Sequence, residues 1–132
     1  MGKDDLIHAM LQRFARAFTT GDGPAAAACW EVPALVAADE GSRAVSSLEE
    51  VAAFFGGAKD QYNQEGVAGT RVDVQRVDWH TDRLASVTVR WPHLDGDGRE
   101  MGRAETSLYV VRVTGEEARI CAVLMLGTHP PP

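Results

Sequence analysis

The sequence predicts a single α+β domain in which helices come first and antiparallel strands follow. Up to about residue 65, apolar residues recur every three or four positions, as they do in amphipathic helices. From Thr70 onward, the pattern changes to long strand-like runs separated by short turns, which suit hairpins rather than crossovers. A length of 132 residues accommodates one hydrophobic core.

Two helices are expected at the start of the chain. The first spans Asp4 to Thr19, with acidic residues in its first turn and Gly21 just beyond its end. The second is short, from Pro24 to about Trp30, because proline is favoured at the first helical position. Pro33 is expected to follow the end of this helix.

Two short strands and a third helix come next. Residues 34–38 and 43–45 are expected to pair as strands around the turn at residues 39–42. Ser46 or Ser47 is a suitable N-cap for the third helix. Its apolar side carries Val51, Phe54, Phe55, Ala58 and Tyr62.

The second half is expected to form four strands, over residues 70–80, 84–91, 101–114 and 119–126. Gly- and Asp-rich turns separate them. Residues 128–132 end in three prolines, which lack the amide donor that a sheet requires. We therefore expect one domain over residues 1–127 and a proline-rich tail over residues 128–132.

The charge of the chain argues against a nucleic-acid partner. Thirteen basic and 19 acidic residues give a formal net charge of −6, and the basic residues are scattered. No stretch reaches the roughly 18 apolar residues that a membrane span needs, and no signal-peptide pattern opens the sequence. Cys29 and Cys121 stand alone among apolar neighbours, as free thiols do. We expect a cytoplasmic protein without membrane contact.

The sequence also predicts neither a metal site nor a cofactor. His8, His80, His93 and His129 lie far apart without metal-ligand spacing. The run Asp95-Gly96-Asp97-Gly98 lacks the further ligands of a calcium-binding loop, so we interpret it as a hairpin turn.

Two segments carry a resemblance to a known superfamily. They are the helix end Gln12-Arg13-Phe14-Ala15-Arg16-Ala17-Phe18-Thr19-Thr20-Gly21-Asp22 and the strand entry Trp30-Glu31-Val32-Pro33-Ala34-Leu35-Val36. Together with the element order, they resemble the nuclear-transport-factor-2-like superfamily, which includes ketosteroid isomerases and SnoaL-like cyclases. The resemblance implies a cystatin-like roll: a cone-shaped, strongly curved antiparallel sheet wrapped on three N-terminal helices around one pocket.

The resemblance does not extend to the catalytic residues of the isomerases. Phe14 aligns with their oxyanion-hole tyrosine, Ala38 with their general-base aspartate, and Tyr109 with their protonated acid. Asp39 lies one residue from the base position, where strand alternation turns a side chain to the opposite face.

The same alignment predicts which residues line the pocket. Strand alternation turns Val89 and Trp91 inward beside Glu105, Ser107 and Tyr109. Aromatic residues from the helical half would close the cavity, or would simply form the core. The predicted ligand-binding residues are Phe14, Phe18, Trp30, Phe54, Phe55, Val89, Trp91, Glu105, Ser107 and Tyr109.

Glu105 and Tyr109 share one face of a strand, about 13 Å apart at roughly 3.3 Å per residue. A carboxylate in an apolar cavity could act as a general acid or base. The competing interpretation is an ion pair between Glu105 and Arg103 or Arg90.

Two functions remain open at this stage. The first is binding of a small apolar or amphipathic molecule. The alternative is a SnoaL-like or ketosteroid-isomerase-like lyase, isomerase or cyclase with Glu105, Tyr109 or Asp39 as catalytic residues. We also expect a homodimer through the outer face of the sheet, because residues 120–126 are apolar throughout. Cys121, Val123 and Met125 would form part of that face.

Overall fold

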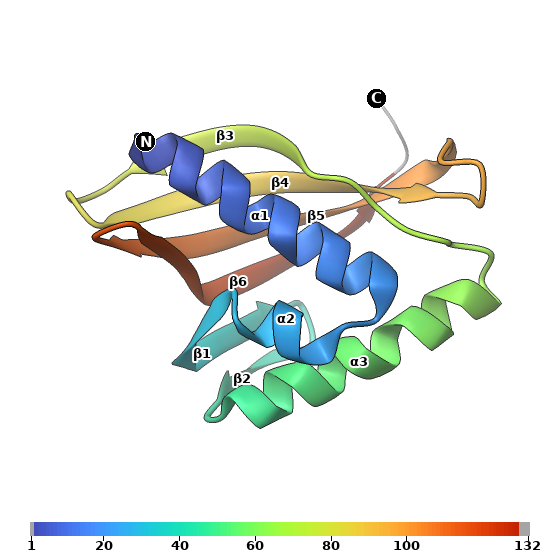
Figure 1. Cartoon of the computed structure of the whole chain (residues 1–132), viewed down its shortest axis with the longest axis horizontal. Helices are drawn as coiled ribbons and strands as arrows, with labels where there is room; N and C mark the ends of the chain where they lie inside the picture. Colours follow the sequence, from blue (N-terminus) through green and yellow to red (C-terminus); the bar gives the residue numbers. More distant parts are fainter. Residues whose placement is uncertain (1, 130–132) are drawn as a thin grey trace.

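The computed structural model describes residues 2–129 (Figure 1). Helices come first and the long strands follow, as the sequence predicts. The elements are α1 (Lys3–Thr20), α2 (Gly23–Ala27), β1 (Trp30–Ala38), β2 (Gly41–Val45), α3 (Leu48–Gln64), β3 (Asp73–Trp79), β4 (Leu84–Leu94), β5 (Glu100–Thr114) and β6 (Glu117–His129).

The six strands form one curved sheet in the order β2-β1-β6-β5-β4-β3. All strand pairs that are consecutive in sequence are antiparallel. The pair β1–β6, which joins the two halves of the chain, is parallel. Figure 1 shows α1 crossing in front of β4 and β5, whereas α3 runs beside β1 and β2. The chain therefore forms the helix-backed curved α+β sheet that the sequence predicts.

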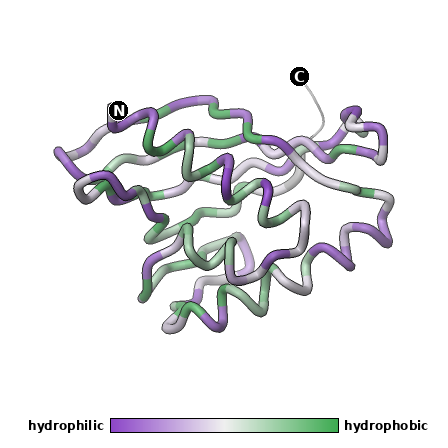
Figure 2. The backbone as a smooth tube through the Cα atoms, in the orientation of Figure 1, coloured by the Kyte–Doolittle hydropathy of each residue, from purple (hydrophilic) through white to green (hydrophobic). Residues whose placement is uncertain are grey.

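The core lies between α1 and the middle of the sheet. Ile7, Met10 and Leu11 on the inner face of α1 are fully buried. Val87, Val89, Val111 and Ile120 are fully buried on the strands. Hydrophobic and hydrophilic segments alternate along α1 in Figure 2, which is the pattern of a helix with one buried face.

The second helix is shorter than the sequence predicts. It ends at Ala27, and Trp30 already belongs to β1, where it pairs with Ile120 of β6. The Ile120 amide donates to the Cys29 carbonyl at 2.8 Å. Pro33 therefore lies inside a strand, at a stretch of β1 that has no β2 partner. Long-range strand pairing has overridden the helix propensity of the alanine run.

The strands β4 and β6 continue past the ends expected for them. β4 continues through Pro92 to Leu94 because β3 pairs only as far as Arg90, so the proline meets an unpaired edge. β6 continues to His129 and pairs with the start of β5. The first two residues of the expected tail therefore belong to the sheet, and residues 130–132 of that tail lie outside the described residues.

Bulges in β6 change the predicted phase of that strand. The register shifts between Val110 and Val111 of β5, where Cys121 is the extra residue of β6. One extra residue moves every later side chain to the other face. Val123 is consequently buried, and Val123 and Met125 line the inner cavity rather than the outer face. The prediction that these two residues lie on the outer face is wrong.

Among the described residues, no helix combines the length and apolar character that crossing a bilayer requires.

Candidate functional site

A cavity of about 550 Å³ lies between α1, α3 and the concave face of the sheet. Apolar side chains make up most of its wall, together with backbone and a few polar groups. Eight aromatic residues contribute to the lining: Phe14, Phe18, Trp30, Phe54, Phe55, Tyr62, Trp91 and Tyr109. The size and aromatic lining are typical of small-molecule sites.

The cavity exists because α3 stands off the central strands. Gly23 allows α2 and α3 to pack closely, since a Cβ atom there would lie 2.2 Å from the Ala52 carbonyl oxygen of α3. α3 packs against α1, α2, β1 and β2. Val51 is its buried residue, whereas Phe54 is 61% exposed. The apolar side of α3 therefore faces open space instead of a filled core.

Most of the predicted ligand-binding residues surround this cavity. The structure places nine of them on its lining: Phe14, Phe18, Trp30, Phe54, Phe55, Trp91, Glu105, Ser107 and Tyr109. Val89 has the predicted inward phase but is fully buried in the core. Asp39 is exposed in the turn between β1 and β2 and does not reach the cavity.

Phe14 lies at the centre of the aromatic lining. Its ring meets Trp30, Phe55, Trp91 and Tyr109 edge to face, with centroids 5.0–6.3 Å apart. Such edge contacts favour one fixed arrangement of the rings. The aromatic wall is therefore held together by contacts among its own rings. Phe14 is both part of the hydrophobic core and part of the cavity lining.

Three polar side chains of the lining, those of Tyr62, His93 and Glu105, lie together, and we call this group the polar end. Arg43 and Glu50, which form an ion pair with each other, also line the cavity. The Tyr62 hydroxyl donates to Glu105 Oε1 at 2.7 Å. Burial, and then this hydrogen bond, raises the pKa of the Tyr62 hydroxyl. The tyrosine therefore stays protonated and holds one oxygen of the carboxylate.

Among the described residues, Glu105 forms an ion pair with neither Arg103 nor Arg90. Arg90 instead contacts Glu100 at 2.9 Å and Asp73 at 3.5 Å. The ionic contact of Glu105 is with His93, whose Nε2 lies 3.9 Å from Oε2. Glu105 therefore faces the cavity with its second oxygen not hydrogen-bonded to His93.

His93, like Tyr62, is a residue of the polar end that is absent from the ligand-binding residues predicted from the sequence. It is 6% exposed, and both ring nitrogens are buried without a hydrogen-bond partner in the described structure. Its ring lies 5.6 Å from that of Tyr62. Alternation would have found it, because Val87, Val89, Trp91 and His93 are two apart and turn to one face. The strand predicted over residues 84–91 ends before His93 and so does not include it.

Tyr109 occupies the middle of the cavity wall as a neutral group. Its hydroxyl oxygen accepts a hydrogen bond from Trp91 Nε1 at 2.9 Å. Burial raises the pKa of the Tyr109 hydroxyl, although hydrogen bonds from Ser107 and Trp91 act in the opposite direction. Tyr109 therefore offers a hydroxyl, and no negative charge, to the cavity at neutral pH.

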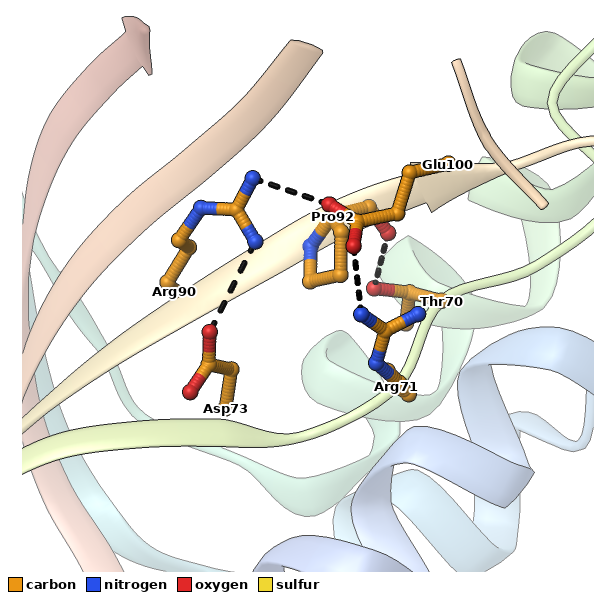
Figure 3. Close-up of polar contacts among 6 residues, drawn as sticks. All are labelled: Thr70, Arg71, Asp73, Arg90, Pro92 and Glu100. Carbon is orange, nitrogen blue, oxygen red and sulfur yellow. Dashed lines mark hydrogen bonds and ion pairs between the residues drawn. The ribbon is translucent and has the colours of Figure 1, made fainter. Parts of the chain in front are cut away.

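Charged residues hold one rim of the cavity in place (Figure 3). Thr70, which lines the cavity, donates to the Pro92 carbonyl at 2.8 Å. Beside it, the Glu100 carboxylate bridges Arg71 and Arg90. Hydrogen bonds from these arginines hold the pKa of Glu100 below its ordinary value, and the bond from Arg71 has the larger effect. The network fastens the segment before β3 to β4 and β5.

No group of three His, Cys, Asp or Glu side chains within the described residues is arranged to hold a metal ion.

Comparison with known families gives a match over almost the whole chain. A family model described as NTF2-like protein (DUF6841) matches residues 3–128. No protein with a curated description matches the sequence.

Solved structures of similar fold include three bacterial proteins. A cystatin-like domain of unknown function from Nostoc punctiforme is 26% identical, with a TM-score of 0.72 over 94% of this chain and 76% of that one. A second cystatin-like protein from the same organism is 13% identical, with a TM-score of 0.71 over 94% and 90%. An NTF2-like protein from Shewanella oneidensis is 15% identical, with a TM-score of 0.69 over 93% and 98%.

Proposed function

The chain belongs to the NTF2-like family DUF6841, and on that premise we propose that its cavity binds a small apolar or amphipathic molecule. The observation that carries the proposal is a cavity of about 550 Å³ that eight aromatic residues line without filling. Packed interiors leave few voids larger than a water molecule, so an unfilled volume of this size points to a ligand.

The test uses a cavity-filling variant and a matched control. Ala58 of α3 lines the cavity, whereas Ala53 of the same helix is exposed and does not. Ala58→Trp should abolish the fluorescence gain of N-phenyl-1-naphthylamine, an apolar probe, whereas Ala53→Trp should leave it unchanged. Equal binding by both variants, or no binding by the unaltered protein, would contradict the proposal.

Acid–base chemistry on the bound molecule, as a SnoaL-like or ketosteroid-isomerase-like lyase, isomerase or cyclase, is the second candidate. The polar end favours it, because Glu105 has one oxygen held by Tyr62 and the other turned toward His93. Tyr109 adds a neutral hydroxyl. Conversion of a bound substrate by the unaltered protein but not by Glu105→Gln, at similar affinity, would select this function over binding alone.

We further propose that the protein is a homodimer through the outer face of its sheet. Cross-strand pairs place Ala122 between Leu35 and Val110, and Leu124 beside Leu108. These five residues, which we call the outer patch, lie opposite the side of Val36, Val123 and Tyr109 that lines the cavity. A solvated sheet face would carry polar residues here, so an apolar patch favours a second copy of the chain.

A further inference from the structure

The polar end of the cavity combines three properties that restrict the chemistry of its ligand. Tyr62 donates to Glu105 Oε1, so this oxygen is already occupied. Glu105 Oε2 makes its nearest ionic contact with His93 Nε2 at 3.9 Å. Neither nitrogen of His93 has a hydrogen-bond partner in the described structure. An acceptor and an unpaired imidazole therefore stand side by side at the end of an apolar cavity.

One oxygen placed beside Glu105 Oε2 and His93 Nε2 can contact both groups. A separation of 3.9 Å is too long for a direct hydrogen bond. An oxygen at about 2.8 Å from each group would span it, with an angle of roughly 90° between its two contacts. The Glu105 side chain is 36% exposed, so it can turn to admit such an atom beside the shielded Nε2.

We propose that Glu105 and His93 recognise a hydroxyl group on an uncharged, apolar ligand. This inference rests on the proposed function, because it assigns the polar end of the same cavity. The ligand hydroxyl donates to Glu105 Oε2 and accepts from the N–H of His93, while the aromatic wall covers its apolar body. A hydroxyl both donates and accepts, so it matches a carboxylate and an imidazole at once.

The charge of Glu105 and the imidazole N–H of His93 disfavour charged groups on the ligand. A ligand carboxylate would meet the like charge of Glu105 in a cavity where apolar walls reduce screening. An ammonium group would attract Glu105 but has no lone pair to accept from the imidazole N–H. It would also lose more hydration than a hydroxyl on entering an aromatic cavity. Alcohols and phenols are therefore the class that this end selects.

The test compares four probes that share one apolar body: naphthalene, 2-naphthol, 2-naphthoate and 2-naphthylmethylammonium. Their affinities are measured by displacement of N-phenyl-1-naphthylamine at neutral pH. We expect 2-naphthol to bind roughly tenfold more tightly than naphthalene, because its hydrogen bond to Glu105 involves a charged acceptor. We expect 2-naphthoate to bind most weakly of the four.

Variants of the polar end separate charge from hydrogen bonding. Glu105→Leu should remove the advantage of 2-naphthol and leave naphthalene unchanged or tighter. Glu105→Gln keeps an acceptor oxygen, so it should retain part of that advantage and lift the penalty of 2-naphthoate. His93→Leu should reduce the 2-naphthol advantage alone, and Phe54→Ala should weaken all four probes alike. Thermal unfolding of each variant checks that it is folded.

The outcomes distinguish this inference from the proposed function. If naphthalene binds but 2-naphthol has no advantage, or keeps it in Glu105→Leu, the hydroxyl inference is overturned and the apolar site stands. Tighter binding of the ammonium probe than of 2-naphthol also overturns it, in favour of a cationic ligand. If no probe binds, the proposed function fails and the inference fails with it.

Discussion

The Tyr62 hydroxyl on α3 donates to the Glu105 carboxylate on β5 at 2.7 Å, and this bond crosses the cavity from helix to sheet. It joins residues 43 positions apart in sequence. α3 otherwise packs against α1, α2, β1 and β2. The bond therefore fixes the distance between the far end of α3 and the central strands, and with it the width of the polar end.

Tyr62→Phe should release this link while keeping the aromatic ring. We expect the free energy of unfolding to fall by about 1–2 kcal/mol, because the acceptor is charged but the bond is only partly buried. Urea denaturation followed by tryptophan fluorescence measures it. Glu105→Gln should lower the free energy of unfolding by less in the Tyr62→Phe variant than in the unaltered chain. Additive losses would show that the two side chains are not coupled.

Both tyrosines of the chain should resist ionisation in the folded state. Burial raises the pKa of Tyr62 and of Tyr109 above the ordinary value of 10.0. A raised pKa favours the protonated form, so this contribution to stability is complete below about pH 10. It is lost as the pH rises further, because the unfolded chain then releases its protons first.

Ultraviolet titration of the phenolate band measures this effect. The folded protein should show little phenolate near pH 10, whereas the chain in denaturant should be half ionised there. Tyr62→Phe and Tyr109→Phe report the two groups separately. A folded protein that titrates like the denatured chain would contradict the burial of both hydroxyls.

Alanine substitutions at Gly23 and Gly57 should change the stability of the protein in opposite directions. At Gly23, a Cβ atom would lie 2.2 Å from the Ala52 carbonyl oxygen, so Gly23→Ala should destabilise the protein by about 1–3 kcal/mol. At Gly57 inside α3, a Cβ atom would meet no atom within 4 Å. Gly57→Ala should stabilise the protein by about 0.5–1 kcal/mol through helix propensity. Thermal unfolding of the two variants measures the change in Tm for each. Changes in Tm of the same sign would contradict the prediction that the two glycines differ.

The rim network makes a prediction about Glu100. Hydrogen bonds from Arg71 and then Arg90 lower its pKa, so the ionised form is favoured in the folded state. The corresponding contribution to stability is present above the unfolded pKa and is lost as the pH falls through the folded one. Arg71→Ala should raise the pKa of Glu100, as measured by carbon NMR titration. Arg76→Ala, which removes a partner of Asp78 instead, should leave it unchanged.

Strand alternation was sufficient to predict which face of β5 lines the cavity. Trp91 lies opposite Glu105, and Val87 lies opposite Tyr109, as the predicted phase requires. Helix periodicity likewise placed Phe14, Phe55 and Tyr62 on inward faces. These patterns are local, because they depend on the 2.0 and 3.6 residue periods of the backbone.

The features that local patterns missed depend on distant partners. The bulge at Cys121 is defined only by the register of β6 against β5, so Val123 and Met125 were assigned to the wrong face. Pro92 continues β4 because β3 leaves that edge unpaired. The bond between Tyr62 and Glu105 joins two elements whose separation no sequence period encodes.

The last prediction concerns the outer patch and the homodimer. Leu124 is 40% exposed at the centre of this patch, beside Leu108. Leu124→Glu would bury a carboxylate in the interface, which costs several kcal/mol when the charge is unpaired, and should therefore shift the protein to monomers. Leu48 on α3 is 41% exposed and lies outside the patch, so Leu48→Glu is the matched control. Sedimentation equilibrium at micromolar concentration should show dimers for the unaltered chain and Leu48→Glu, and monomers of about the 14.2 kDa chain mass for Leu124→Glu. A monomeric unaltered protein, or dimers in all three, would exclude the outer patch as the interface.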